Sequence, residues 1–236
     1  KLLKTYNMKF GVVIFPGSNC DMDMVYVLEN IMKKEVVKLW HKDTDLQNCD
    51  FIILPGGFSF GDYLRSGAIA NYSPIMGKVV DHANNGGYVM GICNGFQILC
   101  ESGILPGALL HNTNHKFICK NIHLKTITKN TLVTNQYADN AIKIPIAHGE
   151  GRFHANEKTL EELKNNDQIL FKYCDENGEI NDESNPNGSL LNIAGVCNKN
   201  RNVFGMMPHP ERAADIELIN TDGKILFDSI LNSVLS

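Results

Sequence analysis

The chain has 236 residues, of which 43% are hydrophobic and 20% charged, so it can bury a sizeable core within one α/β domain. Its formal net charge of −4, without a cluster of Lys and Arg, argues against nucleic acid or an acidic membrane surface as partner. No apolar stretch is long enough to cross a bilayer, and the first residues are too short and polar for a signal peptide. We therefore expect a cytoplasmic protein whose partners are small molecules or other proteins.

A single domain is expected over residues 8–236, with residues 1–7 as an extension before a natural start at Met8. The 7 cysteines are odd in number and contain no Cys-x-x-Cys pair, which is typical of reduced thiols in the cytosol. For all of them except Cys93 we expect burial as small hydrophobic side chains.

The first half of the chain alternates short β-branched runs with helix-length segments. Strands are expected at residues 10–15, 36–40, 51–54 and 88–92, and helices at 21–33, 74–84 and 96–101. This alternation predicts a doubly wound, mostly parallel α/β sheet flanked by helices. Ligands bind such sheets at the carboxyl ends of the strands, which draws attention to the loops at residues 16–19 and 55–62 and to the turn at Cys93.

The second half contains more strand-like runs and two Asn-Gly turns. The strands are expected at residues 117–128, 141–147, 169–173 and 190–197, and the turns at 177–178 and 187–188, within a polar loop or hairpin tip. Added hairpins are therefore expected in this half. Residues 223–235 show helical spacing of apolar side chains and predict a closing helix that packs on the sheet.

Cys93 lies in Gly91-Ile92-Cys93-Asn94-Gly95, between an apolar strand and a helix. Glycines on both sides of a central residue allow a tight strand-to-helix turn that presents one side chain above the sheet. The helix N-terminus favours the thiolate, which is the nucleophilic form of cysteine. The pattern predicts a cysteine nucleophile elbow.

A base for this nucleophile is predicted at His209, in the run Pro208-His209-Pro210-Glu211. The flanking prolines favour an extended segment in which residues two apart face the same way, so Glu211 should lie beside His209. A carboxylate that holds one ring nitrogen leaves the other to accept the thiol proton, which completes a Cys-His-Glu triad. Taken alone, the same run is also compatible with a surface turn that has no chemistry.

His148 is a rival base, because His148-Gly149-Glu150 has the same spacing. Its glycines make that segment flexible, whereas a catalytic base benefits from being held rigidly. His209 is therefore preferred to His148.

Gly56 and Gly57 follow the strand at residues 51–54 and can turn backbone N–H groups toward the elbow. The N–H groups of Gly57 and Asn94 would then form an oxyanion hole. A phosphate-binding loop is disfavoured because the lysine and glycine spacing of such loops is missing. No His or Cys spacing indicates a metal site.

These motifs resemble the triad-type (class I) glutamine amidotransferases. The resemblance is carried by the Cys93 elbow through Gln97 together with His209-Pro210-Glu211. Residues 54–65, 185–189 and 206–212 are similar, more narrowly, to the family of free-standing glutaminase subunits of phosphoribosylformylglycinamidine synthase, and the similarity runs from about Met8 to the end of the chain.

The resemblance implies that Cys93 attacks the side-chain amide of L-glutamine, that His209 protonates the departing ammonia and that the thioester is hydrolysed to glutamate. It further implies that Gly56 and Gln97 bind glutamine, although Gln97, one turn past the elbow, is equally compatible with an ordinary residue on the helix surface. Ammonia would pass to a separate synthetase subunit, which uses ATP and Mg²⁺ in the fourth step of purine synthesis, and a small accessory subunit is a further candidate partner. This chain itself shows no nucleotide-binding loop, so no cofactor is expected on it.

The long glycine loop offers candidate contacts for that partner, because exposed aromatic and arginine side chains are frequent interface anchors. The candidates are Phe58, Phe60, Tyr63 and Arg65, although core packing is an equal alternative for the aromatic residues. His111 stands where the family would be expected to carry arginine.

Two other functions remain open at this stage. The chain is also compatible with a glutaminase for another synthetase, for example in guanylate, cytidylate or pyridoxal phosphate synthesis, although the loop at residues 58–65 argues against it. A non-catalytic redox or chaperone-like protein of the same fold would not need the complete Cys, His and Glu set.

Overall fold

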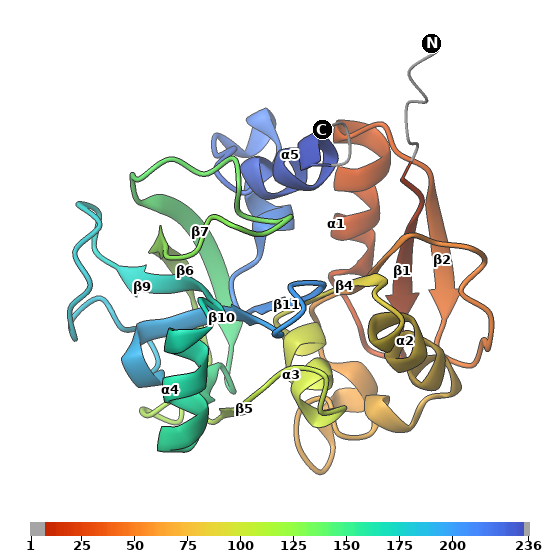
Figure 1. Cartoon of the computed structure of the whole chain (residues 1–236), viewed down its shortest axis with the longest axis horizontal. Coiled ribbons are helices and arrows are strands. Elements are labelled where there is room, and N and C mark those ends of the chain that lie inside the picture. Colours follow the sequence, from red (N-terminus) through yellow and green to blue (C-terminus); the bar gives the residue numbers. More distant parts are fainter. Residues whose placement is uncertain (1–7, 234–236) are drawn as a thin grey trace.

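The computed structural model describes residues 8–233, and the expected extension at residues 1–7 lies outside them. The strands of the main sheet are β1 (Phe10–Ile14), β2 (Val36–Trp40), β3 (Phe51–Leu54), β4 (Tyr88–Ile92), β6 (Ile118–Thr126), β7 (Ile142–His148), β9 (Ile169–Cys174), β10 (Ile193–Cys197) and β11 (Val203–Met206). They follow the order β2-β1-β3-β4-β11-β10-β9-β6-β7 (Figure 1). Two short strands, β5 (Ala108–Leu110) and β8 (Arg152–His154), pair separately with each other.

One end of the sheet, from β2 to β11, is parallel. The four strands expected in the first half all form here, and β11 joins them from late in the chain. The β3 side chains Phe51, Ile52, Ile53 and Leu54 are completely buried. Such continuous burial is what a parallel strand covered on both faces requires.

The other end of the sheet, from β10 to β7, is antiparallel and contains the added hairpins. The expected turn at residues 177–178 forms, with Gly178 at a φ of +83°. The expectation for residues 187–188 as part of an exposed tip is wrong, because Asn187 is completely buried. Its Nδ2 atom donates a 2.9 Å hydrogen bond to the carbonyl of Gly151, so this loop is folded against the protein.

The helices are α1 (Asp21–Tyr26), α2 (Pro74–Asn84), α3 (Asn94–Glu101), α4 (Glu157–Asn165) and α5 (Lys224–Ser233). The helix expected over residues 21–33 ends earlier as an α-helix, because a π-helical turn follows at Val27–Ile31. α3 packs against β3, β4 and β11, which fixes the position of the turn that precedes it.

Buried apolar side chains from both halves of the chain form one hydrophobic cluster. The 7 cysteines are all free. Cys119 is exposed and Cys100 is half-buried, which corrects the expectation of burial for both. Cys119 lies in a run of three exposed residues, 119–121, near the start of β6. Within residues 8–233, every helix is too short or too polar to cross a membrane.

Candidate active site

The site forms at the carboxyl ends of four neighbouring parallel strands. β1, β3, β4 and β11 lie side by side, and the segments that follow them carry Cys20, Gly56, Cys93 and His209, respectively. Residues that are up to 192 positions apart in sequence therefore meet at one edge of the sheet, as between Cys20 and Arg212. This is the edge at which open α/β sheets bind ligands.

Cys93 occupies a strained turn between β4 and α3. Its backbone has a φ of +49° and a ψ of −105°, a conformation that non-glycine residues avoid and that recurs at functional sites. The turn is held by a 2.8 Å hydrogen bond from the Cys93 N–H to the carbonyl of Met206. The structure thus forms the elbow that the sequence predicts.

The two elbow glycines are required by close packing. A Cβ atom on Gly91 would lie 2.5 Å from the carbonyl carbon of Gly95, and one on Gly95 would lie 1.9 Å from the carbonyl oxygen of Leu54. Both distances are far below van der Waals contact. α3 can therefore begin directly against the end of β3 only because neither residue has a side chain.

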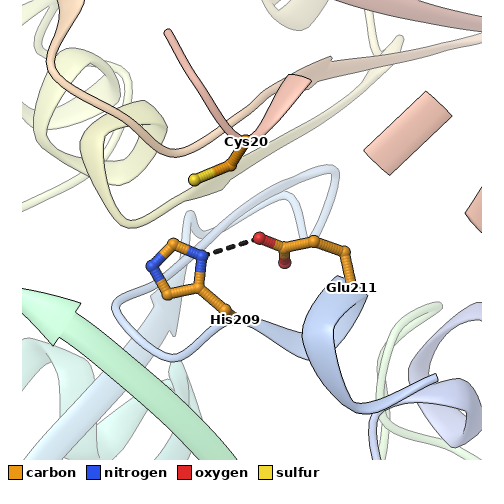
Figure 2. A group of neighbouring side chains, drawn as sticks. All are labelled: Cys20, His209 and Glu211. Carbon is orange, nitrogen blue, oxygen red and sulfur yellow. Dashed lines mark hydrogen bonds and ion pairs between the residues drawn. The ribbon is translucent and has the colours of Figure 1, made fainter. Parts of the chain in front are cut away.

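His209 and Glu211 form a buried pair (Figure 2). The Nδ1 atom of His209 lies 2.6 Å from Oε1 of Glu211, and the two residues are 1% and 3% exposed. The segment is not extended as expected, because Glu211 lies in a 3₁₀ turn that begins at Pro210. The fixed φ of proline suits the first position of a helical turn, and the turn brings the two side chains together.

The electrostatics of His209 suit a base that is paired with a thiol. Burial alone would lower its pKa, but the Glu211 carboxylate and the Cys93 sulfur beside it raise the pKa well above its usual value. Since Nδ1 faces the carboxylate, it carries the proton that Glu211 accepts. The Nε2 atom is buried and has no hydrogen-bond partner among the described residues, so it is available to the reaction.

A cavity of about 180 Å³ opens beside Cys93. This volume is smaller than the roughly 300–1,000 Å³ of pockets for drug-sized ligands, which indicates a small substrate. Its lining residues are Gly57, Phe58, Asp62, Ser66, Cys93, Gln97, His111, His115, Lys116, Phe117, Ala147, His148, Gly149 and Glu150.

Of the two residues expected to form an oxyanion hole, Gly57 lines this cavity and Asn94 directly follows Cys93, which also lines it. Gly57 has a φ of +132°, and a Cβ atom there would lie 2.5 Å from the backbone nitrogen of Asn19. Asn94 is the first residue of α3, where backbone N–H groups have no partner within the helix. Its side chain accepts a 3.1 Å hydrogen bond from the N–H of Ser59, which ties the glycine loop to the elbow.

Gln97 and Gly56 have different surroundings. Gln97 lines the cavity, accepts a hydrogen bond from Nδ2 of Asn94 at 2.9 Å and donates one to the carbonyl of Glu150 at 2.6 Å. Gly56 lies against His209, since a Cβ atom there would be 2.7 Å from Cε1 of the ring. Gly56 therefore makes room for the imidazole ring, while Gln97 joins the elbow to the loop after β7.

His148 lines the same cavity but lacks a carboxylate partner. Its Nδ1 atom lies 3.1 Å from Oδ1 of Asn112, and its Nε2 atom is buried without a partner among the described residues. Burial, with a contribution from nearby His209, lowers its pKa to about 4, so the ring is neutral. Glu150 instead faces His111, at 3.3 Å from its Nε2 atom. His148 and Glu150 therefore do not form a second His-Glu pair, although they have the same spacing in sequence as His209 and Glu211.

Cys20 and Asp62 belong to the site although the sequence did not single them out. The Cys20 sulfur accepts a 3.1 Å hydrogen bond from Nη2 of Arg212 and lies above the His209 ring (Figure 2). Asp62 lines the cavity, and burial with the nearby Glu150 charge raises its pKa to about 6. The segment Pro16-Gly17-Ser18-Asn19 directed attention to the loop before Cys20, but nothing in the sequence gave its contact with His209.

Among residues 8–233, one group of side chains has the spacing to hold a metal ion. Ligand atoms of Cys20, His209 and Glu211 lie within 4.8 Å of one another. A cation between them would replace the His209–Glu211 hydrogen bond and would lie beside the Arg212 guanidinium, and both effects oppose binding.

The candidate partner contacts differ in exposure. Phe58 and Tyr63 are 44% and 74% exposed. Phe60 is half-buried, with its ring centroid 5.3 Å from that of His41. Arg65 is exposed and donates from Nε to Oε1 of Glu101 at 2.7 Å. Phe58, Tyr63 and Arg65 are therefore exposed on this loop, while Phe60 packs inward.

Comparisons with known proteins agree with this geometry. A family model described as the CobB/CobQ-like glutamine amidotransferase domain matches residues 7–223. The PurLQS structure from Thermotoga maritima superposes with a TM-score of 0.84 at 42% identity, covering 97% of this chain and 99% of that chain. A glutamine amidotransferase from the same organism shares the fold, with a TM-score of 0.56 at 15% identity over 98% of this chain and 95% of that chain.

Sequence relatives match along nearly their whole length. Phosphoribosylformylglycinamidine synthase subunit PurQ of Acaryochloris marina is 53% identical over 97% of this chain and 98% of that protein. The subunit of the same name from Moorella thermoacetica is 52% identical over 95% of this chain and 96% of that protein. The fold and site define a class I glutamine amidotransferase. Within that class, the chain belongs to the PurQ family.

Proposed function

We propose that this chain is the glutaminase subunit of a phosphoribosylformylglycinamidine synthase, hydrolysing L-glutamine to glutamate and ammonia. The observation that carries the proposal is the buried His209–Glu211 pair beside the strained Cys93 elbow, at the edge of a cavity for a small substrate. The full-length similarity to PurQ subunits supports the choice of synthase among glutamine-dependent enzymes.

In the first half of the reaction, the Cys93 sulfur forms a bond to the side-chain amide carbon of glutamine. His209 takes the thiol proton on Nε2, and the carbonyl electrons move onto oxygen. The N–H groups of Gly57 and Asn94 stabilise that oxyanion. When the intermediate collapses, the C–N bond breaks, His209 returns the proton to nitrogen, and ammonia leaves a thioester on Cys93.

In the second half, water attacks the thioester carbon while Nε2 of His209 accepts its proton. The C–S bond then breaks, the proton passes to the Cys93 sulfur, and glutamate leaves. Throughout, Glu211 holds Nδ1 and stabilises the imidazolium form, so it takes no direct part in bond making.

The ammonia is used by a second protein. A solved structure that is 42% identical to this chain is named PurLQS, and we propose that this chain likewise assembles with a synthetase subunit and a small accessory subunit. ATP and Mg²⁺ would bind to the synthetase, which activates the formamide oxygen that ammonia replaces. The free cysteines support a reducing compartment, and we place the complex in the cytoplasm.

Labelling with a diazo-ketone analogue of glutamine tests this function, because the analogue reacts with an activated thiol in a glutamine-shaped pocket. Peptide mapping by mass spectrometry should find the label on Cys93, both in the wild type and in Cys20→Ala, which removes the neighbouring thiol. Cys93→Ala should remain unlabelled. Absence of label from the wild type, alone and mixed with the synthetase subunits, would overturn the proposal.

A further inference from the structure

A second apolar surface lies next to the catalytic His-Glu segment. It consists of Met22, Tyr26, Ile216, Leu218 and Ile219, which we call the 216–219 surface, and its members are 55%, 46%, 78%, 56% and 93% exposed. Met22 and Tyr26 are four residues apart on α1 and so share one helix face. Clustered apolar side chains of this kind mark interaction sites more often than single exposed ones do.

This surface is held in a fixed shape. The hydroxyl of Tyr26 donates a 2.8 Å hydrogen bond to Oδ2 of Asp215, which joins α1 to the segment that follows Glu211. Nδ2 of Asn220 donates a 2.7 Å hydrogen bond to the carbonyl of Lys143 and anchors the other end. Because both ends of the segment are held, its backbone cannot rearrange to bury these apolar side chains, and they remain exposed.

Ile219 also has a strained backbone. Its φ of +59° is unfavourable for a β-branched residue, and such strain persists where the surrounding structure enforces it, most often at functional positions. Among the large hydrophobic residues in the described part of the chain, Ile219 is the most exposed. Its strained backbone therefore holds an apolar side chain in solvent.

A cavity of about 400 Å³ leads from this surface to the triad. It is lined by Asp23, Tyr26, Val27, Glu211, Arg212, Asp215 and Leu218. Oε2 of Glu211 is buried and has no hydrogen-bond partner among the described residues. The triad therefore lies between two cavities, with Cys93 at the glutamine cavity and Glu211 at this second one.

We propose that the 216–219 surface is the docking site for the synthetase subunit, an inference that rests on the function proposed above. A partner that receives ammonia has to reach the triad without blocking the entry of glutamine. The exposed rings of Phe58 and Phe117 border the Cys93 cavity, which glutamine has to enter, whereas the 216–219 surface reaches Glu211 through the second cavity. Docking here would cover the cavity behind Glu211 and would bury side chains that water now surrounds.

The charged residues around the 216–219 surface indicate which charge the partner's surface should carry. Asp23, Asp215 and Glu217 border the surface on the side of the second cavity, where the lining cation Arg212 is already paired with Asp23 at 3.1 Å. Lys143 lies on the other side, where it lines a separate cavity with Leu218 and Ile219. The partner should therefore present an apolar patch bordered by Lys or Arg. A second copy of this chain is disfavoured, because a two-fold contact would place the same acidic border against itself.

The chain offers a matched pair of variants for the test. Ile219 and Leu64 are 93% and 89% exposed, and both have a left-handed backbone, with φ of 59° and 70°. Leu64 lies in the glycine loop at the mouth of the glutamine cavity, the rival docking surface. Aspartate tolerates this backbone better than a branched apolar residue does, so neither Ile219→Asp nor Leu64→Asp should unfold the protein. Thermal melting checks this.

The dissociation constant of each variant for the synthetase and accessory subunits, purified from the same source, can be measured by sedimentation velocity. Loss of one central anchor should weaken binding by about 30-fold or more in Ile219→Asp. Leu64→Asp should bind within about threefold of wild type. Labelling of Cys93 by the diazo-ketone should be unchanged in Ile219→Asp.

The outcomes separate this inference from the proposed function. Wild-type affinity of Ile219→Asp would overturn the docking site, even if Cys93 is labelled and the glutaminase function holds. Self-association of the wild type that Ile219→Asp abolishes would also overturn it, in favour of a second copy. Failure of the wild type both to bind the synthetase and to be labelled would remove the proposed function, and this inference with it.

Discussion

Nδ1 of His209 and Oε1 of Glu211 lie 2.6 Å apart, in a pair that is almost completely buried. A hydrogen bond to an ionised carboxylate is short and about twice as strong as a neutral one. Because the bond fixes the tautomer, the lone pair of the neutral ring lies on Nε2, which serves the thiol and the departing ammonia. Glu211, which is separated from His209 by a single residue in sequence, thus sets both the orientation and the protonation of the base.

Glu211→Gln should keep this geometry while removing the charge. By analogy with amide replacement of a triad carboxylate, kcat should fall by roughly 10²–10⁴-fold with little change in KM. Ammonia release measured over a range of glutamine concentrations separates the two parameters. Cys93→Ala, which removes the nucleophile, sets the background and should abolish turnover. If Glu211→Gln is as inactive as Cys93→Ala, the carboxylate does more than orient and stabilise the base.

The elements of the site that the sequence predicted are those that local patterns determine. The elbow follows from glycines around Cys93, and the His209–Glu211 contact follows from proline spacing, even though the segment is a 3₁₀ turn and not extended. Cys20 could not be predicted as a neighbour of His209. Their contact depends on the order of β1, β3, β4 and β11 in the sheet, and no local pattern reports that order.

The same distinction holds for the fold. The parallel strands of the first half were predicted because each is a continuous apolar run. β11 (Val203–Met206) was missed because it is short and contains Gly205, which makes room for the Phe96 ring. α4 (Glu157–Asn165) was missed because it is mostly polar, with Leu163 as its buried residue. Its cap was a usable signal, since Asn156 accepts a 2.8 Å hydrogen bond from the N–H of Thr159.

His148→Asn distinguishes the two histidines of the site. The asparagine can still approach Asn112, but it loses the unpartnered Nε2 atom of a residue that lines the glutamine cavity. If His148 contacts substrate and does not act as base, KM for glutamine should rise about tenfold, in line with loss of one buried polar contact. kcat should change by less than about fivefold.

His209→Asn is the matched variant and should behave in the opposite way, with kcat reduced to the Cys93→Ala background. Steady-state kinetics on both proteins at one pH gives the comparison. A collapse of kcat in His148→Asn with KM unchanged would reverse the two assignments.

Asp62 should make stability depend on pH. Its pKa is raised to about 6, chiefly by burial, whereas an unfolded aspartate has a value near 3.9. Between these values the folded state binds the proton and the unfolded state does not. The stabilisation is therefore fully present below about pH 4 and is lost as the pH rises through about 6.

Asp62→Asn remains neutral and should escape this loss. The free energy of unfolding of the variant, relative to wild type, should increase between pH 4 and pH 7 by about 1 kcal/mol, after allowance for partial solvent screening of the carboxylate. Urea denaturation at several pH values measures the difference. Asp182→Asn, at an exposed aspartate, is the control. An equal pH trend in both variants would contradict the assignment to Asp62.

Gly95→Ala tests the packing that forms the elbow. The added Cβ atom would meet the carbonyl oxygen of Leu54 at 1.9 Å, and the backbone atom it meets cannot rotate away. α3 would have to move off β3, so the free energy of unfolding should fall by about 3 kcal/mol, as expected of overpacking. Because α3 carries the N–H of Asn94, glutaminase activity should fall further than stability alone explains.

Gly77→Ala is the matched control, since a Cβ atom at Gly77, within α2, meets nothing within 4 Å. Alanine there should stabilise the protein by roughly 0.5–1 kcal/mol through its helix propensity and leave activity intact. Urea denaturation of both variants measures the contrast, and similar stability of the two would show that the elbow tolerates a side chain where the geometry forbids one.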